Sequence, residues 1–272
     1  MNYNPLLELV EKAERIEALA AAELYSHTPP DFAAEIGVKS QWFGASLALA
    51  AHHIDWTLFN RVFPLGLDHP VTEHFIDDLC AFFAGNANPV HAFQLTPLAQ
   101  PHHAADWLKA RGYRHRDNWT RLVRDGSPPH VIASDLDVEI ITAEQAEVFA
   151  HTMNRAFGAP EALAKWFTPL VGRPNWHHVM AFDGDHPAAT AALFIDGDVG
   201  WLGFAGTLPK YRGLGAQSLL IHKRIEIGRQ HGVKQFVAEV VEDTPERRNP
   251  SDHNLRRLGF QEIYKRANWA KA

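Results

Sequence analysis

Apolar and polar residues follow two periods along this chain, and the periods predict an order of helices and strands. Residues 5–25 place apolar side chains about every 3.6 positions, which predicts an amphipathic helix. The first half then predicts strands over 40–49 and 53–59, a helix over 71–83, a strand over 90–95 and a helix over 104–111. The second half predicts a strand over 138–142, helices over 144–157 and 160–171, strands over 177–182, 188–195 and 199–207, a helix over 216–231, a strand over 235–241, a helix over 251–258 and strands near 260–270.

Turn residues divide the pattern near its middle. Segment 124–137, RDGSPPHVIASDLD, combines turn residues with two prolines and is the best candidate for a linker. Residues 106–122 and 253–272 each contain a short apolar helix, a basic residue, a glycine followed by an aromatic residue, and a later tryptophan. This echo at the end of each half favours a duplicated fold. We therefore expect two domains, 1–130 and 136–272.

Composition narrows the classes of protein to which the chain can belong. Its 272 residues are 46% hydrophobic and 21% charged, an ordinary globular balance. The net charge of −6 argues against a nucleic-acid partner. Cys80 is the only cysteine, which favours a reducing compartment. The N-terminal stretch has no basic leader, and no apolar run approaches the ~18 residues of a membrane span, so we expect a cytoplasmic protein without a membrane partner.

The seventeen histidines raise the question of a metal site. Adjacent pairs stand at 52–53, 102–103 and 177–178, but neighbouring residues of a strand point to opposite faces. No His-Glu-x-x-His or Cys/His ligand spacing is present. We therefore expect no metal site.

The stretch LPKYRGLGAQSLL, residues 208–220, places a glycine-rich turn between a predicted strand and a predicted helix. Small residues let an anion approach the backbone, and the unpaired N–H groups at a helix start favour negative charge. The alternative is a tight corner without a ligand. The Walker pattern fails because Ala216 and Gln217 stand where Lys and Ser or Thr are required, and the dinucleotide fingerprint fails because Ser218 replaces its third glycine.

At this turn the chain resembles the GNAT superfamily of acyl-CoA N-acyltransferases, whose pyrophosphate loop reads (Gln/Arg)-x-x-Gly-x-(Gly/Ala). Pro209, Arg212 and Gly215 match this loop, whereas Gln217 departs from its last position. A second landmark, NPSDHNLRRLGF at 249–260, resembles the penultimate helix of the family.

The resemblance covers about 136–272 and implies an α+β fold, in which a mixed, mostly antiparallel sheet is flanked by helices. It extends weakly to 1–135, which resembles the degenerate first half of a tandem GNAT protein. There NRVFPLGLDHP has no glycine pair, so we expect this half not to bind CoA.

The resemblance implies that acetyl-CoA binds where the fourth and fifth strands of the domain separate. Backbone N–H groups of the glycine loop would hold the pyrophosphate, and the strand before it would bind the pantetheine amides and polarise the thioester carbonyl. Two residues of the penultimate helix could contact pantetheine or the sulfur. The implied CoA-binding residues are Gly206, Thr207, Leu208, Arg212, Gly213, Leu214, Gly215, Ala216, Gln217, Ser251 and Asn254.

For catalysis, the resemblance implies a glutamate base and leaves the acid open. Glu239, in FVAEVVED, matches the base of N-terminal-amine acetyltransferases in this superfamily. The alternative is a strand glutamate that faces solvent or pairs with a basic residue. Leu255 occupies the place where many members carry a tyrosine that acts as the general acid. Tyr264, Tyr211 or water therefore remain candidates for protonating the thiolate.

We therefore expect an acetyl-CoA-dependent N-acetyltransferase that acts by direct attack on a small-molecule or peptide amine. Trp166 and Trp176 are candidates for lining the acceptor pocket. The acceptor, the acyl-chain preference and the oligomeric state, for which a homodimer is one candidate, stay open. Two rival interpretations remain: a catalytically inactive CoA-binding sensor or interaction module, and a nucleotide-binding protein of another fold.

Overall fold

The computed structural model describes residues 4–129 and 133–271, and the chain divides into two compact units. The first unit contains Met1–Ser26, Pro30–Arg121 and Ile263–Ala272, and the second contains His27–Pro29 and Leu122–Glu262. Residues 130–132 of the linker predicted over 124–137 lie outside the described residues.

This division differs from the predicted domains at the C-terminus. Residues from Ile263 onward group with the first unit, because strand β11 (Gln261–Lys271) pairs antiparallel with β4 (Ala92–Leu95). Local patterns cannot show this, because strand pairing joins residues far apart in the sequence.

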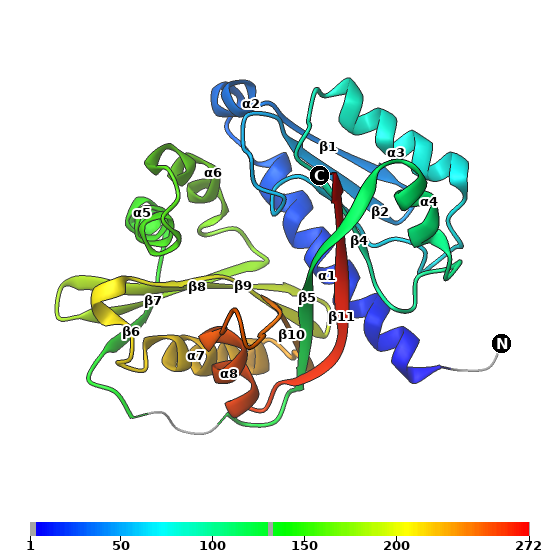
Figure 1. Ribbon diagram of the computed structural model, residues 1–272. Helices are drawn as coiled ribbons and strands as arrows, with labels where there is room; N and C mark the ends of the chain where they lie inside the picture. The colour runs from blue at the N-terminus through cyan, green and yellow to red at the C-terminus, as the bar shows by residue number, and fades with distance from the viewer. Residues whose placement is uncertain (1–3, 130–132, 272) are drawn as a thin grey trace. The chain divides into compact units, whose positions relative to one another are not determined.

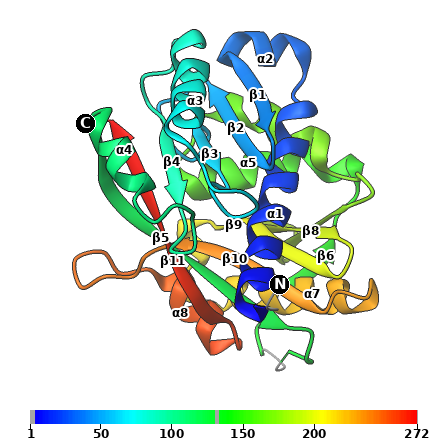
Figure 2. The same cartoon turned by 90° about the vertical axis from the view of Figure 1, so that its right-hand side faces the viewer.

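The first unit is a sheet with helices on both faces. Its strands follow the order β1-β2-β3-β4-β11-β5, with β3 and β4 parallel. Figure 2 shows α1 and α3 on opposite sides of β2 and β3. Besides β4 and β11, the elements are α1 (Pro5–Ser26), α2 (Pro30–Ile36), β1 (Val38–Phe43), β2 (Ser46–Ala51), β3 (Arg61–Phe63), α3 (Glu73–Gly85), α4 (Ala104–Ala110) and β5 (Tyr113–Asp125), whose residues up to Arg121 belong here.

Two predictions in this half were wrong. Residues 40–49 are not one strand, since they contain a hairpin of β1 and β2 that turns at Gly44, where φ is 60°. Residues 53–59 form turns instead of a strand. The side-chain amide of Asn60 donates to the carbonyls of Ile54 and Trp56 at 2.6 and 3.0 Å, and such bonds compete with strand pairing.

The second unit is also a sheet between helices. Its elements are β6 (Asp137–Ile140), α5 (Ala146–Phe157), α6 (Ala164–Phe167), β7 (Trp176–Asp183), β8 (His186–Asp196), β9 (Val199–Thr207), α7 (Ala216–Gln230), β10 (Gln235–Val241) and α8 (Pro250–Arg257). The helix predicted over 160–171 is shorter than expected, because α6 is flanked by 3-10 turns at Glu161–Leu163 and Thr168–Leu170.

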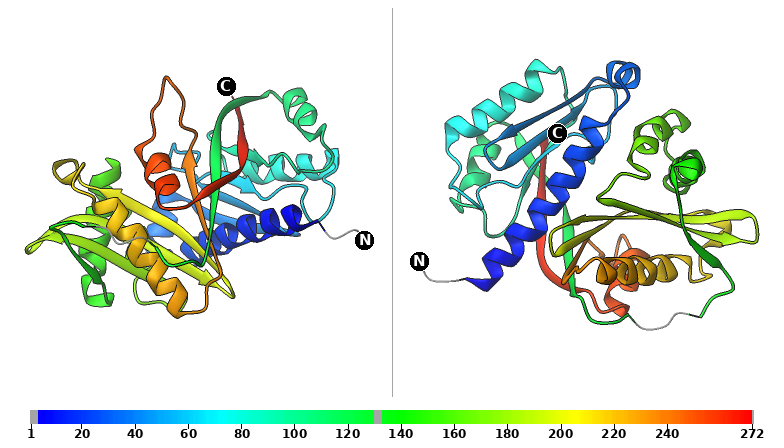
Figure 3. Two further views of the ribbon diagram at one scale, coloured as in Figure 1. Left: turned by 90° about the horizontal axis from the view of Figure 1, so that it is seen from below. Right: turned by 180° about the vertical axis from the view of Figure 1, so that it is seen from behind.

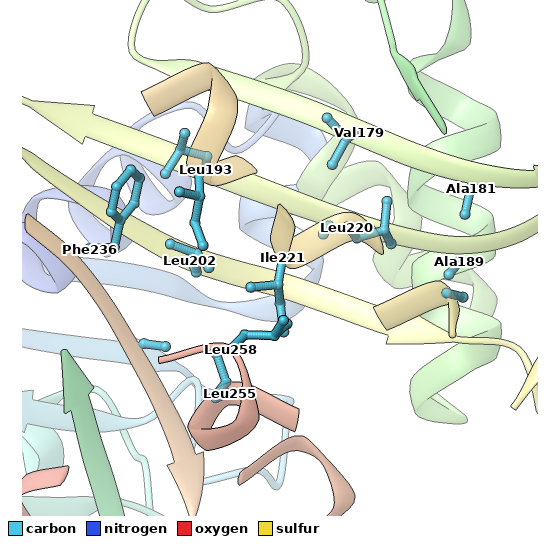
Figure 4. Packing of buried hydrophobic residues seen from close by; sticks show 14 of the residues in the cluster. Val179, Ala181, Ala189, Leu193, Leu202, Leu220, Ile221, Phe236, Leu255 and Leu258 are labelled. Atoms are coloured by element: carbon cyan, nitrogen blue, oxygen red, sulfur yellow. The ribbon is translucent and has the colours of Figure 1, made fainter. Parts of the chain in front are cut away.

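In this unit β6, β7, β8 and β9 pair antiparallel in sequence order, and β10 joins β9 in parallel. Helices α5 and α6 cover one face of the sheet, and α7 and α8 cover the other (Figures 1 and 3). Figure 4 shows the core on the second face, where Leu202 and Phe236 of the sheet lie near Ile221 of α7 and Leu255 of α8. The predicted α+β class, with mostly antiparallel strands flanked by helices, is confirmed.

The echo between the two halves has a structural basis. Helix α4 is followed by Gly112 and strand β5, and α8 is followed by Gly259 and strand β11. Both glycines have positive φ, 83° and 90°, a conformation that ends a helix and that glycine adopts without strain. The repeated motif is therefore a helix, a left-handed glycine and a long strand.

Candidate functional site

Strands β9 and β10 separate at their carboxyl ends. Their registered pairs run from Val199–Gln235 to Leu202–Ala238, and both strands then continue beyond the last pair. Unpaired backbone groups on separating strands can bind the backbone-like amides of a ligand. This is the strand geometry that the sequence resemblance implied.

A β-bulge lies in the separated part of β9. Thr190 is opposite Gly206, but Ala192 is opposite Gly203, so Phe204 and Ala205 together face one residue of β8. Phe204 has a φ of 50°, which is rare for a bulky residue. A bulge leaves one residue out of the ladder, and its N–H becomes available to a ligand. Sequence reasoning missed this bulge; the flanking glycines were its only signal.

The glycine loop is open at its surface. Gly213 and Gly215 have φ values of 82° and 81°, so the backbone conformation itself requires glycine. A Cβ placed at Gly213 would have no atom within 4 Å, and one at Gly215 would meet only Ser134 at 3.9 Å. Gly215 is also the N-cap of α7 and gives it no side-chain cap. Open space therefore lies beside the loop at the start of this helix, as an anion site requires.

Two side chains hold the loop in place. Ser134 donates to the carbonyl of Leu214 at 3.1 Å, and Arg212 Nε donates to the carbonyl of Thr207 at 3.3 Å. The Arg212 bond joins the loop to the end of β9, where the structure also places Gly206 and Leu208. Sequence reasoning did not identify Ser134, which no local pattern connects to the loop.

The side chain of Gln217 contacts α8. Its Nε2 donates to Ser251 Oγ at 2.8 Å, and its Oε1 accepts from Asn254 Nδ2 at 2.8 Å. The structure therefore brings together three residues that the sequence analysis assigned to CoA binding. Leu255, on the same helix, is 4% exposed and packs into the core, so this position supplies no acid.

Glu239 lies just beyond the last registered pair of β9 and β10 and is half-buried. Val237 is opposite Trp201, and alternation along β10 puts Glu239 on the same face as these two residues. Trp201 lies over Gly203, where an added Cβ would be 2.0 Å from its ring. The indole ring of Trp201 therefore forms an aromatic wall beside Glu239, the candidate base.

Trp176 belongs to the aromatic wall, and Trp166 lies behind it. Trp176 is 3% exposed, stacks on Phe204 with ring centroids 5.6 Å apart and meets Trp201 edge-on at 6.3 Å. Trp166 is fully buried and contacts Phe167 at a centroid distance of 6.1 Å, and Phe167 in turn meets Phe204 edge-on at 5.1 Å.

One of the candidate acids, Tyr264, is engaged elsewhere. Tyr264 belongs to the first unit and donates its hydroxyl proton to Glu14; burial and this carboxylate raise the pKa of Tyr264 well above its usual value. Within residues 4–129 and 133–271, His, Cys, Asp and Glu form no group of three that could hold a metal ion. No helix in the described ranges has the length and apolar character to span a membrane.

Comparisons with known proteins agree with this geometry. Residues 141–260 match the Acetyltransferase (GNAT) family. Among solved structures, a GCN5-related N-acetyltransferase from Kribbella flavida has a TM-score of 0.63 at 17% identity, covering 92% of this chain and 95% of that one. A putative GNAT acetyltransferase from Novosphingobium aromaticivorans has a TM-score of 0.55 at 14% identity, covering 96% and 99%.

A further match is a tandem GNAT protein from the clavulanic acid biosynthesis pathway, with a TM-score of 0.51 at 17% identity over 72% of this chain and 67% of that one. A comparison with curated proteins found no match. Residues 141–260 therefore resemble the GNAT family, and the fold is that of two GNAT-like domains. This fold supports an acyl-CoA N-acyltransferase and excludes the rival of a nucleotide-binding protein of another fold.

Proposed function

We propose that this GNAT domain transfers an acetyl group from acetyl-CoA to an amine by direct attack in a ternary complex. The observation that carries the proposal is the uncapped N-terminus of α7, which faces open space behind two left-handed glycines. The N–H groups from Gly213 to Gln217 would bind the pyrophosphate, aided by the helix dipole, whereas the N–H of Arg212 donates to the carbonyl of Pro209 at 3.3 Å. The end of β9, at Gly206 and Thr207, would bind the pantetheine amides, whereas the N–H of Leu208 already donates to the carbonyl of Ala188.

Glu239 is proposed as the base. The acceptor arrives as an ammonium and must lose a proton before its nitrogen can attack the thioester carbon. As the N–C bond forms and the C–S bond breaks, the thiolate leaves with the electron pair. A thiol pKa near 8.5 makes this thiolate a tolerable leaving group, so protonation by water is sufficient.

Ser251 and Asn254 are proposed to contact pantetheine or the sulfur from α8. Their hydrogen bonds to Gln217 hold both side chains at the start of α7. A small amine or a peptide N-terminus is the proposed acceptor, and the aromatic wall around Trp201 suits an acceptor with an apolar body.

Calorimetric titration with acetyl-CoA tests the proposal. The native protein should bind in the micromolar range, and Gly215→Glu should abolish binding by placing a carboxylate where the pyrophosphate binds. Gly232→Glu is the matched control, because Gly232 follows the other end of α7, has the same φ of 81° and has no atom within 4 Å of an added Cβ. No binding by the folded native protein would remove the assignment.

A thiol-release assay over a panel of amines separates the enzyme from the remaining alternative, a CoA-binding sensor or interaction module. Thiol release that requires both acetyl-CoA and an amine supports the transferase. Tight binding without release for any small amine or peptide N-terminus supports the module.

A further inference from the structure

Arg224 lies on α7 beneath the bulge of β9. Its side chain is 2% exposed and contacts the sheet through two carbonyl groups. Nη1 donates to the carbonyl of Ala192 in β8 at 3.1 Å and, at the longer distance of 3.4 Å, to that of Gly203 in β9, while Nε donates to Leu220 one turn earlier. Ala192 and Gly203 are the pair at which the regular register stops before the bulge. Arg224 therefore contacts both strands where β9 changes its course.

This arginine is a buried cation without a counter-ion. Burial lowers the pKa of Arg224 to about 9, so the guanidinium stays charged at neutral pH. Within the part of the chain that the structure describes, no carboxylate pairs with it. Burying a charge without an opposite partner is unfavourable, and an apolar side chain of similar volume would fill the same space without that penalty. Packing of α7 on the sheet does not explain a charged residue here.

The bond to Gly203 fixes the orientation of the next N–H group. The carbonyl of Gly203 and the N–H of Phe204 belong to one planar trans peptide, in which they point in opposite directions. Because Arg224 attracts this carbonyl toward α7, the N–H of Phe204 is turned away from α7. On the far side of the bulge, the N–H of Leu208 bonds the carbonyl of Ala188 at 2.9 Å. The bulge is thus held from both ends, with the left-handed Phe204 between them.

We propose that Arg224 is a positioning residue for acyl transfer, which holds the bulge of β9 so that its N–H groups polarise the thioester carbonyl. The inference rests on the proposed function, because it requires acetyl-CoA to place its thioester at this bulge. Arg224 exchanges no proton in the reaction. Its charge also stabilises the negative charge that develops on the thioester oxygen and then on the sulfur, since few water molecules screen a buried cation.

Arg224→Met and Arg224→Lys test the role. Methionine removes the charge and the donors at similar volume, whereas lysine keeps the charge without the planar fork. Arg229→Met is the control on the same helix, since Arg229 donates to the carbonyl of Gly126 at 2.9 Å and not to the bulge. We expect Arg224→Met to bind acetyl-CoA nearly as well as the native protein but to lose about 10- to 100-fold in kcat. The upper end of this range is comparable with the loss that removal of one oxyanion donor causes. Arg224→Lys should recover part of this loss.

The carbonyl stretching frequency of bound acetyl-CoA, labelled with carbon-13 at the acetyl carbonyl, gives a readout that a purely structural role would not change. Polarisation lowers this frequency in the native protein, and Arg224→Met should return it toward the value of free acetyl-CoA. An unchanged frequency and kcat in both variants would overturn the role of Arg224 alone. If Arg224→Met does not fold, Arg224→Lys decides by the same two measurements. Failure of the native protein to bind acetyl-CoA would overturn the proposed function and this inference together.

Discussion

The side-chain amide of Gln217 donates a hydrogen bond to Ser251 Oγ at 2.8 Å, which joins the second residue of α7 to the second residue of α8. The same amide accepts from Asn254, so the residue that departs from the usual pyrophosphate loop connects two helices. A glutamine at this position would obstruct a phosphate if its side chain pointed toward the glycine loop. The structure instead directs it to α8.

Replacing Gln217 with alanine should therefore affect stability more than ligand binding. Two hydrogen bonds are lost, which should lower the free energy of unfolding by about 1–2 kcal/mol. The dissociation constant for acetyl-CoA should stay within about threefold, a change of less than 1 kcal/mol. Urea unfolding and calorimetry measure the two quantities. A tenfold gain in affinity would mean that the native side chain obstructs the ligand.

Glu239→Gln should separate catalysis from binding. The amide keeps the size of the side chain but cannot accept the proton of the ammonium, so kcat should fall about 10²- to 10⁴-fold at neutral pH. Affinity for acetyl-CoA should be unchanged, and raising the pH should restore part of the activity by supplying neutral amine. Full activity of the variant would return Glu239 to the alternative of a structural strand glutamate.

Gly203→Ala should lower stability through Trp201. The added Cβ would lie 2.0 Å from the indole ring, so the ring must move, and overpacking of this kind costs about 1–3 kcal/mol. In a Trp201→Ala background the same change should cost much less, which a double-mutant cycle measures by thermal unfolding. Equal costs in both backgrounds would show that the indole does not restrict this position.

Glu17→Gln should destabilise the first unit strongly. Glu17 is 1% exposed and pairs with Arg61 at 2.8 Å and Arg266 at 3.0 Å, as well as with Arg121. Removing one partner from such a buried group costs about 3–5 kcal/mol. Urea unfolding at pH 7 measures this cost, and exposed Glu11→Gln on the same helix should change stability by no more than about 0.5 kcal/mol.

The effect of Glu17 should depend on pH with a defined sign. Burial alone would raise the pKa of Glu17, but the attraction of the arginines outweighs burial and holds this pKa far below its usual value. The ionised form is therefore favoured in the folded state. The stability that it contributes is present above the unfolded pKa of about 4.3 and is lost as the pH falls below it. A difference between native protein and variant that grows on acidification would contradict this assignment.

His178 should make the second unit sensitive to mild acid. Burial, followed by the nearby charge of His177, lowers the pKa of His178 to about 3, and neither ring nitrogen has a hydrogen-bond partner within the described part of the chain. The unfolded chain takes up a proton below about pH 6.5, whereas the folded protein does not until the pH approaches 3. Stability should therefore fall by about 1.4 kcal/mol for each pH unit between these limits. Urea unfolding of His178→Phe should show a smaller pH dependence than the native protein, because burial also lowers the pKa of His177 and His91, and exposed His186→Phe should retain the native dependence.

The sequence by itself determined the local features of this protein. The periodicity of residues 5–25 predicted α1, and the pattern over 71–83 predicted α3, which Thr72 caps by accepting from the N–H of Phe75 at 3.1 Å. The glycines at 213 and 215 predicted a special turn before α7, because a left-handed backbone carries a strong preference for glycine. These features depend on residues that are close along the chain.

Only the tertiary structure decided features that depend on distant residues. The pairing of β11 with β4, the bulge at Phe204 and the contact of Gln217 with α8 each join segments that no local pattern connects. The burial of Arg224 is likewise decided by the packing of α7 on the sheet. Propensity and period act over a few residues, whereas burial and partner choice are set when the whole unit packs, and the candidate site depends on both.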